Sequence, residues 1–189
     1  AQNCSSYERG AFTGEVSTEM LKSLGIEYVI IGHSERREFF SEDNKTLHDK
    51  VELSLANKIT PIFCCGETLD VRNKGTHKDF VLSQLQETIY NLSADDFSKV
   101  IIAYEPIWAI GSGMTASVDD IQEMHSAIRS SIKTNYGSAI SRNTSILYGG
   151  SVKPINAKDI FDLEDVNGGL IGGASLVAND FFDIVNSIS

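Results

Sequence analysis

The sequence predicts an α/β fold with a parallel β-sheet, and two observations support this prediction. Short apolar runs recur along the chain, each followed by glycine or polar residues and then by a stretch with helical periodicity. The runs show little alternation of polar and apolar residues, as expected of strands covered on both faces. Repeated units of strand, loop and helix form either an open, doubly wound sheet or a closed barrel. No linker-like segment divides the 189 residues, so we expect a single domain over residues 1–189.

The apolar runs locate the candidate strands. Five runs are centred near residues 30, 62, 102, 146 and 170, and residues 1–3 fit the end of an earlier strand. Amphipathic stretches between the runs predict helices over residues 44–56, 78–92 and 118–134. A complete (β/α) barrel has eight strands and about 250 residues. The sequence therefore predicts either an open sheet or an incomplete barrel of about six parallel strands.

The composition of the chain excludes several classes of partner. Sixteen basic and 26 acidic residues give a formal net charge of −10. Phosphodiester backbones and anionic lipids repel such a chain, which argues against nucleic-acid or membrane partners. The histidines form no metal-ligand pattern, so we expect no metal site, and the sequence has no P-loop. Three cysteines, two of them adjacent, fit reduced thiols in the cytoplasm better than a disulfide framework.

Polar residues directly follow the candidate strands, whose carboxyl ends meet at one edge of a parallel sheet, where such folds bind ligands. Glu105 ends one strand, where desolvation would raise the pKa of its carboxyl group toward that of a general base. His33 follows another strand and could donate a hydrogen bond to a substrate carbonyl as a neutral imidazole. Glu35 could be a second acid or the partner of a neighbouring arginine. All three residues also have purely structural interpretations.

Two glycine turns follow the last two candidate strands. One is Gly149-Gly150-Ser151, and the other contains Gly172 and Gly173. Backbone N–H groups in such turns, and at the start of a helix, bind phosphate without basic side chains. We therefore expect a phosphate site at these turns, although each of them alone could be an ordinary turn.

An apolar loop with small residues at its ends follows Glu105. It contains the single tryptophan of the sequence, and its composition is typical of a lid that closes over a ligand, or of a packed loop. The candidate lid consists of Pro106, Ile107, Trp108, Ala109, Ile110, Gly111, Ser112, Gly113, Met114, Thr115 and Ala116. Residues 111–116 also match the dinucleotide fingerprint G-x-G-x-x-A, but that fingerprint begins directly at the end of a strand, which this match does not.

Six motifs, in order along the chain, resemble those of the triosephosphate isomerase family. They are Gly10-Ala-Phe-Thr-Gly-Glu15, Ile30-Ile-Gly-His-Ser-Glu-Arg-Arg37, Cys65-Gly-Glu-Thr68, Ala103-Tyr-Glu-Pro-Ile-Trp-Ala-Ile-Gly111, Leu147-Tyr-Gly-Gly-Ser-Val152 and Ile171-Gly-Gly-Ala-Ser175. The family has the (β/α)8 TIM-barrel fold and is usually homodimeric. It interconverts dihydroxyacetone phosphate and glyceraldehyde 3-phosphate, in glycolysis and gluconeogenesis, without metal or cofactor. The resemblance implies the same fold and activity here.

The resemblance also implies roles for individual residues. Glu105 resembles the base that moves the proton, His33 the electrophile and Glu35 the supporting glutamate of the family. Residues 106–116 resemble its closing lid, and Thr13 resembles the loop that reaches into the neighbouring subunit. The phosphate-binding set of the family is matched by Gly111, Ser151, Gly172 and Gly173.

The resemblance starts at the end of the family's third strand. We therefore expect the first two βα units to be absent, together with the asparagine and the lysine of the first loop. Because that lysine holds the substrate, we expect this chain alone to be poorly active and marginally stable. Two alternatives remain, a non-catalytic phosphate-binding or assembly fragment and, from the glycines of residues 111–116, an NAD-dependent oxidoreductase.

Overall fold

The computed structural model describes residues 1–111 and 114–188. Its helices and strands alternate along the described chain much as the apolar periodicity predicts. In chain order they are α1 (Thr18–Ser23), β1 (Tyr28–Ile31), α2 (Ser34–Phe39), α3 (Asn44–Ala56), β2 (Thr60–Glu67), α4 (Leu69–Asn73), α5 (His77–Thr88), α6 (Ala94–Phe97), β3 (Ile101–Pro106), η1 (Ile107–Ala109), α7 (Val118–Asn143), β4 (Ile146–Tyr148), α8 (Pro154–Phe161), η2 (Gly173–Leu176) and α9 (Ala178–Asn186).

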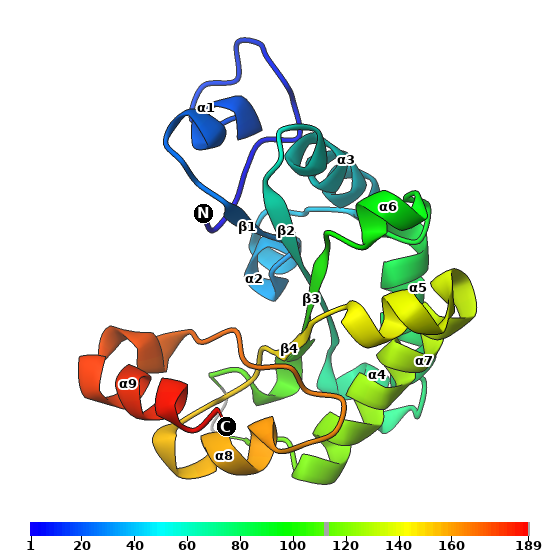
Figure 1. Cartoon of the computed structure of the whole chain (residues 1–189), viewed down its shortest axis with the longest axis vertical. Helices are drawn as coiled ribbons and strands as arrows, with labels where there is room; N and C mark the ends of the chain where they lie inside the picture. Colours follow the sequence, from blue (N-terminus) through cyan, green and yellow to red (C-terminus); the bar gives the residue numbers. More distant parts are fainter. Residues whose placement is uncertain (112–113, 189) are drawn as a thin grey trace.

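Four parallel strands form one sheet in the order β1-β2-β3-β4 (Figure 1). Helices α3, α5 and α7 lie along one side of this sheet, to its right in Figure 1, and cover its apolar residues. Leu47 of α3, Leu85 of α5 and Ile128 of α7 are fully buried there. The chain after each of β1, β2 and β3 thus returns in a helix that packs on the sheet, which confirms the predicted α/β class with parallel strands.

The prediction of six strands is wrong for the described residues, which contain four. The run near residue 170 forms only an isolated bridge between Tyr148 and Gly169. Residues 1–3 form no strand either, although Ala1 exchanges two backbone hydrogen bonds with β1, one from its amino group to Tyr28 and one to its carbonyl from Ile30. Ala1 bonds to two residues of β1, and the segment near residue 170 bonds to only two residues of β4, Ile146 and Tyr148, which makes both ladders too short for a strand.

Helix α7 is longer than the predicted helix over residues 118–134 and reaches Asn143. Gly137 interrupts it with a positive φ of 84°, a conformation that costs glycine little, and the helix kinks there. At the other end, the Ser117 hydroxyl accepts a hydrogen bond from the Asp120 amide, and the Asp120 carboxylate accepts one from the Ser117 amide. This capping box fixes the point at which the chain enters the helix after the candidate lid.

Two glycines fix the position of the β3 backbone at Glu105. Gly66 pairs with Glu105 across the sheet, and a Cβ atom at residue 66 would lie 1.8 Å from the Glu105 carbonyl oxygen. On the other flank, a Cβ atom at Gly149 would lie 3.0 Å from Glu105 Cγ. The buried Gln84 side chain accepts a hydrogen bond of 2.9 Å from the Gly66 amide through Oε1. It donates one of 3.1 Å to the Gly66 carbonyl from Nε2. The sheet therefore holds Glu105 at one place at its carboxyl edge.

Candidate active site

Glu105 lies at the carboxyl edge of the sheet and lines the cavity that is described below. It is the most buried acidic side chain in the lining of that cavity. It is 2% exposed, and its Oε2 accepts a hydrogen bond of 2.9 Å from the Ser34 amide at the start of α2. Its other oxygen, Oε1, is also buried but accepts no hydrogen bond from the described residues. One oxygen of this carboxylate is therefore hydrogen-bonded to the backbone, and the other is available for a proton.

The surroundings of Glu105 raise the pKa of its carboxyl group to about 7. Burial is the main cause, because it disfavours the charged form. The Ser34 hydrogen bond and the nearby Arg37 guanidinium oppose this effect without cancelling it. A carboxylate with a pKa near neutrality is a far stronger base than an ordinary glutamate, yet remains largely ionised at slightly alkaline pH. A general base is the role that the sequence predicts for Glu105.

His33 lies close to Glu105, although β2 separates β1, which precedes His33, from β3, which contains Glu105. The sequence predicted this convergence for residues at the carboxyl ends of parallel strands. The Nε2 atom of His33 is 3.0 Å from Glu105 Oε1. Its Nδ1 atom accepts a hydrogen bond of 3.3 Å from the Glu35 amide, so His33 caps α2 with its own ring. An Nδ1 atom that accepts a hydrogen bond carries no proton, which leaves the proton of the neutral ring on Nε2. His33 therefore presents an N–H donor at the same place as the Glu105 base.

Glu35 also lies at this site, on the first turn of α2. Its carboxylate is 3.8 Å from His33 Nδ1, and more than half of its side chain is exposed. The predicted pairing of Glu35 with an adjacent arginine is absent among the described contacts. Instead, Arg36 pairs with Glu42, while Arg37 donates hydrogen bonds to the carbonyls of Gly32 and Cys64.

A cavity of about 930 Å³ brings the predicted site residues together. Its lining includes the proposed catalytic and phosphate-binding residues His33, Glu35, Glu105, Gly111, Ser151, Gly172 and Gly173. The amide groups of Gly172 and Gly173, which lead into η2, have no hydrogen-bond partner among the described residues. Two cationic side chains, Arg36 and Lys153, also line the cavity. The cavity therefore combines a buried carboxylate, an imidazole ring and unpaired amides suited to an anion.

The described part of the candidate lid is fixed at both ends and exposed between them. Pro106 is the last residue of β3 rather than part of the loop, and Ile107, Trp108 and Ala109 form the short helix η1. Ala109 and Ala116 are buried. The exposed residues between them are Gly111, Met114 and Thr115, and Ser112 and Gly113 lie outside the described residues. Ile110 is half-buried, and Ser151 donates a hydrogen bond to the Ala109 carbonyl, which connects the glycine turn to the lid.

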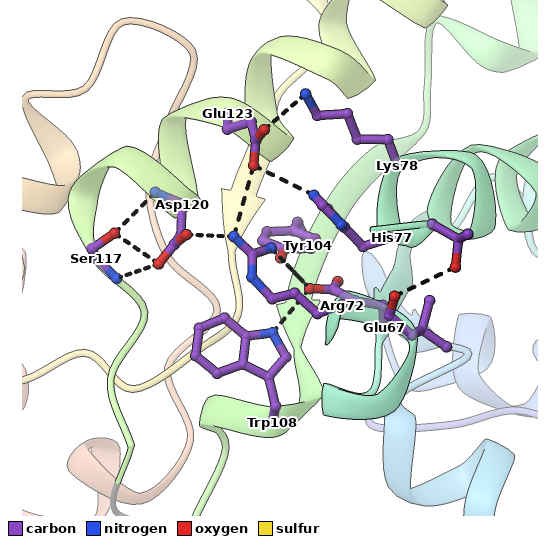
Figure 2. A network of polar contacts seen from close by, with 11 residues as sticks. Glu67, Arg72, His77, Lys78, Tyr104, Trp108, Ser117, Asp120 and Glu123 are labelled. Atoms are coloured by element: carbon purple, nitrogen blue, oxygen red, sulfur yellow. Dashed lines mark hydrogen bonds and ion pairs between the residues drawn. The ribbon is translucent and has the colours of Figure 1, made fainter. Parts of the chain in front are cut away.

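A polar cluster beside the lid was missed by the sequence interpretation. Figure 2 shows Glu67, at the end of β2, surrounded by donors from three elements. Its Oε1 accepts hydrogen bonds from Tyr104 at 3.0 Å and from Trp108 Nε1 at 2.9 Å, and it lies 3.3 Å from Arg72. Burial raises the pKa of the Glu67 carboxyl group, which these donors counteract. A glutamate that ends an apolar strand was a usable signal, since the same pattern pointed to Glu105.

Metal-ligand clusters and membrane-spanning helices are both absent from the part of the chain that the structure describes. No group of three histidine, cysteine or acidic side chains there is arranged to hold a metal ion. No helix among the same residues is long and apolar enough to cross a membrane.

Comparisons with known proteins agree with the motifs of this cavity. A family model described as triosephosphate isomerase matches residues 1–188. A triosephosphate isomerase of Cytophaga hutchinsonii is 59% identical over 187 residues, which are 99% of this chain and 74% of the relative. One of Bacteroides fragilis is 53% identical over 189 residues, or 100% of this chain and 75% of the relative. One of Flavobacterium johnsoniae is 50% identical over 188 residues, again 100% and 75%.

These matches bear on three of the expectations drawn from the sequence. They run from the first residues over 99–100% of the chain, and they do not confirm that the first two βα units are absent. The chain spans about three quarters of the length of these relatives. The relatives are all named triosephosphate isomerase. The matches therefore do not support the expectation of poor activity, nor the alternatives of a non-catalytic fragment and an NAD-dependent oxidoreductase.

Proposed function

This chain belongs to the triosephosphate isomerase family, and we propose that it interconverts dihydroxyacetone phosphate and glyceraldehyde 3-phosphate by glutamate-mediated proton transfer. The observation that supports this most directly is the juxtaposition of Glu105 Oε1 and His33 Nε2, 3.0 Å apart in one cavity. Moving a proton between adjacent carbons requires a base at the carbons and a donor at the oxygens. This pair supplies both, and the reaction is a step of glycolysis and gluconeogenesis.

In the proposed mechanism, Glu105 removes a proton from one substrate carbon and returns it to the next. The electron pair left behind moves onto the carbonyl oxygen and gives an enediolate. The neighbouring hydroxyl group then loses its proton and the former carbonyl oxygen gains one. Return of the first proton to the second carbon completes the new carbonyl group at the former hydroxyl. His33 donates from Nε2 to the oxygen that gains charge. A neutral histidine at a helix start is the established electrophile of triosephosphate isomerases, so this part follows the family. Here the Glu35 amide supports it, by occupying the His33 Nδ1 lone pair.

The phosphate group of the substrate is proposed to bind at the glycine turns. The unpaired amides of Gly172 and Gly173, with Ser151 and Gly111 on the same cavity, form a set of donors that does not depend on net charge. A chain with a net charge of −10 repels a phosphate dianion at long range. Local backbone donors of this kind could bind the dianion in spite of that repulsion. Residues 107–116 would close over the bound substrate, exclude water and protect the enediolate.

The pH dependence of the reaction tests the role of Glu105. Because the pKa of its carboxyl group is raised to about 7 and a base must be ionised, kcat/KM should fall about tenfold per pH unit below pH 7 and level off above it. The measurement is the isomerisation of either triose phosphate between pH 5 and 9, with circular dichroism as the control for folding. A kcat/KM that stays constant down to pH 5 in a folded protein would contradict the assignment.

We also propose a cytoplasmic homodimer. The loop that follows Cys4 exposes apolar side chains, with Tyr7 and Phe12 stacked on each other at 3.9 Å between ring centroids. An exposed apolar patch of this kind is typical of a subunit interface, and Thr13 lies at its tip.

The three cysteines are free and buried, which fits a reducing compartment.

Replacing Phe12 by aspartate is expected to convert the dimer to a monomer, because a charge would have to be buried between the subunits. Light scattering coupled to size exclusion measures the mass of each species. Ile155→Asp is the control, since Ile155 is 91% exposed on α8, away from this loop. A wild-type protein that is monomeric at micromolar concentration would refute the dimer.

A further inference from the structure

We propose that Arg72 is a positioning residue for the lid, because it joins the segment where the lid begins to the segment where it ends. This inference rests on the proposed function only in taking residues 107–116 as a lid. Arg72 lies on α4 and does not line the active-site cavity among the described residues. It acts through Trp108 on one side and Asp120 on the other (Figure 2).

The first connection is to the start of the lid. Arg72 Nη1 lies 3.3 Å from Glu67 Oε1, the oxygen that accepts the Trp108 indole hydrogen bond at 2.9 Å. The guanidinium carbon of Arg72 also lies 5.1 Å from the centroid of the Trp108 ring, within the range of a cation–π contact. Arg72 therefore contacts Trp108 directly and also contacts the carboxylate that holds it.

The second connection is to the segment that follows the lid. Arg72 Nη2 donates a hydrogen bond to Asp120 Oδ1. The other oxygen of Asp120, Oδ2, accepts hydrogen bonds from the Ser117 amide and hydroxyl, at 3.1 and 2.7 Å. Ser117 directly follows Ala116, the last residue of the lid. Arg72 is thus connected, through Asp120 and its hydrogen bonds to Ser117, to the point where the lid ends and α7 begins.

A guanidinium group is suited to this role because it is planar and rigid. Its Nη1 and Nη2 groups face the two carboxylates, so a displacement of either Glu67 or Asp120 tilts the plane and strains the other contact. Only 15% of the Arg72 side chain is exposed, so solvent screens these contacts less than it screens surface ion pairs. Glu123, at 3.7 Å from Nη2, adds a weaker third contact and also pairs with Lys78. The two ends of the lid are therefore expected to move together.

The test uses Trp108 as a reporter, since it is the single tryptophan of the sequence. Its fluorescence is titrated with inorganic phosphate, the group that the lid covers, in the wild type and in Arg72→Met, Asp120→Asn and Lys78→Met. The asparagine side chain in Asp120→Asn retains an oxygen for the helix cap but loses the charge that pairs with Arg72. Lys78→Met is the matched control, because Lys78 belongs to the same cluster through Glu123 but contacts neither Glu67 nor Asp120.

We expect half-saturation of the Trp108 signal to require roughly tenfold more phosphate in Arg72→Met and in Asp120→Asn, a typical size for coupling between sites. kcat and KM for triose phosphate should change together in both variants, as for hinge residues. Arg72→Lys should rescue only in part, since an ammonium group cannot contact both carboxylates through separate coplanar donors. Lys78→Met should behave as the wild type.

The result for Asp120→Asn decides the matter, because Asp120 lies beyond the opposite end of the lid from Trp108. A wild-type response in this variant would overturn the inference, even if Arg72→Met were impaired. A Trp108 signal that ignores phosphate in the wild type would overturn it as well. A protein without isomerase activity that still shows the expected phosphate titrations would refute the proposed function and leave the role of Arg72 intact.

Discussion

Replacing Glu105 by glutamine is expected to lower kcat by roughly 10³-fold or more, a size typical of the loss of a general base. Glutamine has nearly the same shape and can still accept the Ser34 amide hydrogen bond through its carbonyl oxygen. It has no basic lone pair at the position of Oε1, so the substrate proton has no acceptor. Steady-state turnover of dihydroxyacetone phosphate measures the effect. Retention of more than a tenth of wild-type kcat would exclude Glu105 as the base.

The same variant has a distinctive effect on stability. Because burial raises the pKa of Glu105 from 4.5 to about 7, the folded state binds this proton more tightly than the unfolded state. The contribution of Glu105 to stability is therefore present below about pH 4.5 and is lost as the pH rises to about 7. The rise corresponds to roughly 3 kcal/mol at most.

Glu105→Gln has no such proton, so the free energy of unfolding of the wild type should fall relative to that of the variant between pH 5 and 8. Urea unfolding at several pH values measures both free energies. Two parallel curves would show that the carboxylate is not desolvated in solution. A loss of kcat together with this divergence would separate the removal of the base from damage to the fold.

The sequence predicted the elements that depend on local patterns. The apolar runs matched the four strands closely, and the periodic stretches matched α3, α5 and the first part of α7. His33 and Glu105 were expected to meet because both lie at the carboxyl ends of strands in one parallel sheet, and His33 Nε2 lies 3.0 Å from Glu105 Oε1. This argument needs only the direction of the strands and the position of polar residues at their ends.

The interpretation failed where the outcome depends on side chains from distant elements. No role was predicted for Arg72 or Asp120, and nothing in their spacing of 48 residues predicts a hydrogen bond between them. Gln84 likewise has no local signal for its two bonds to Gly66. The run near residue 170 failed for another reason. Apolar character alone does not make a strand where the backbone hydrogen bonds to the sheet reach only two residues of β4, Ile146 and Tyr148.

Gly149 could be a glycine for either of two structural reasons. Its glycine turn was interpreted as part of a phosphate site, whereas its amide donates to the Tyr104 carbonyl at 2.7 Å and its missing side chain makes room for Glu105. Close backbone approach and anion binding both favour glycine, so a sequence motif cannot separate them. The geometry around Glu105 can.

The second large effect is expected for Gly66→Ala, which tests whether this geometry positions the base. A Cβ atom at residue 66 would lie 1.8 Å from the carbonyl oxygen and 2.8 Å from the carbonyl carbon of Glu105. Both are backbone atoms of a buried central strand, so they cannot turn aside as the end of a flexible side chain would. Overpacking of this kind costs typically 1–3 kcal/mol, and we expect about 3 kcal/mol here because backbone must move.

The displacement should also reduce catalysis in the protein that remains folded. Separating β2 from β3 moves Glu105 relative to His33, and a shift of about 1 Å can lower the rate roughly a hundredfold. Gly173→Ala is the stability control, because a Cβ atom there meets no atom within 4 Å and its φ is not positive. Urea unfolding compares the two variants, and turnover below the unfolding midpoint gives the catalytic effect. If Gly66→Ala were as stable and as active as the wild type, the sheet would not hold Glu105 through close backbone contact, and its position would have to come from the Ser34 hydrogen bond instead.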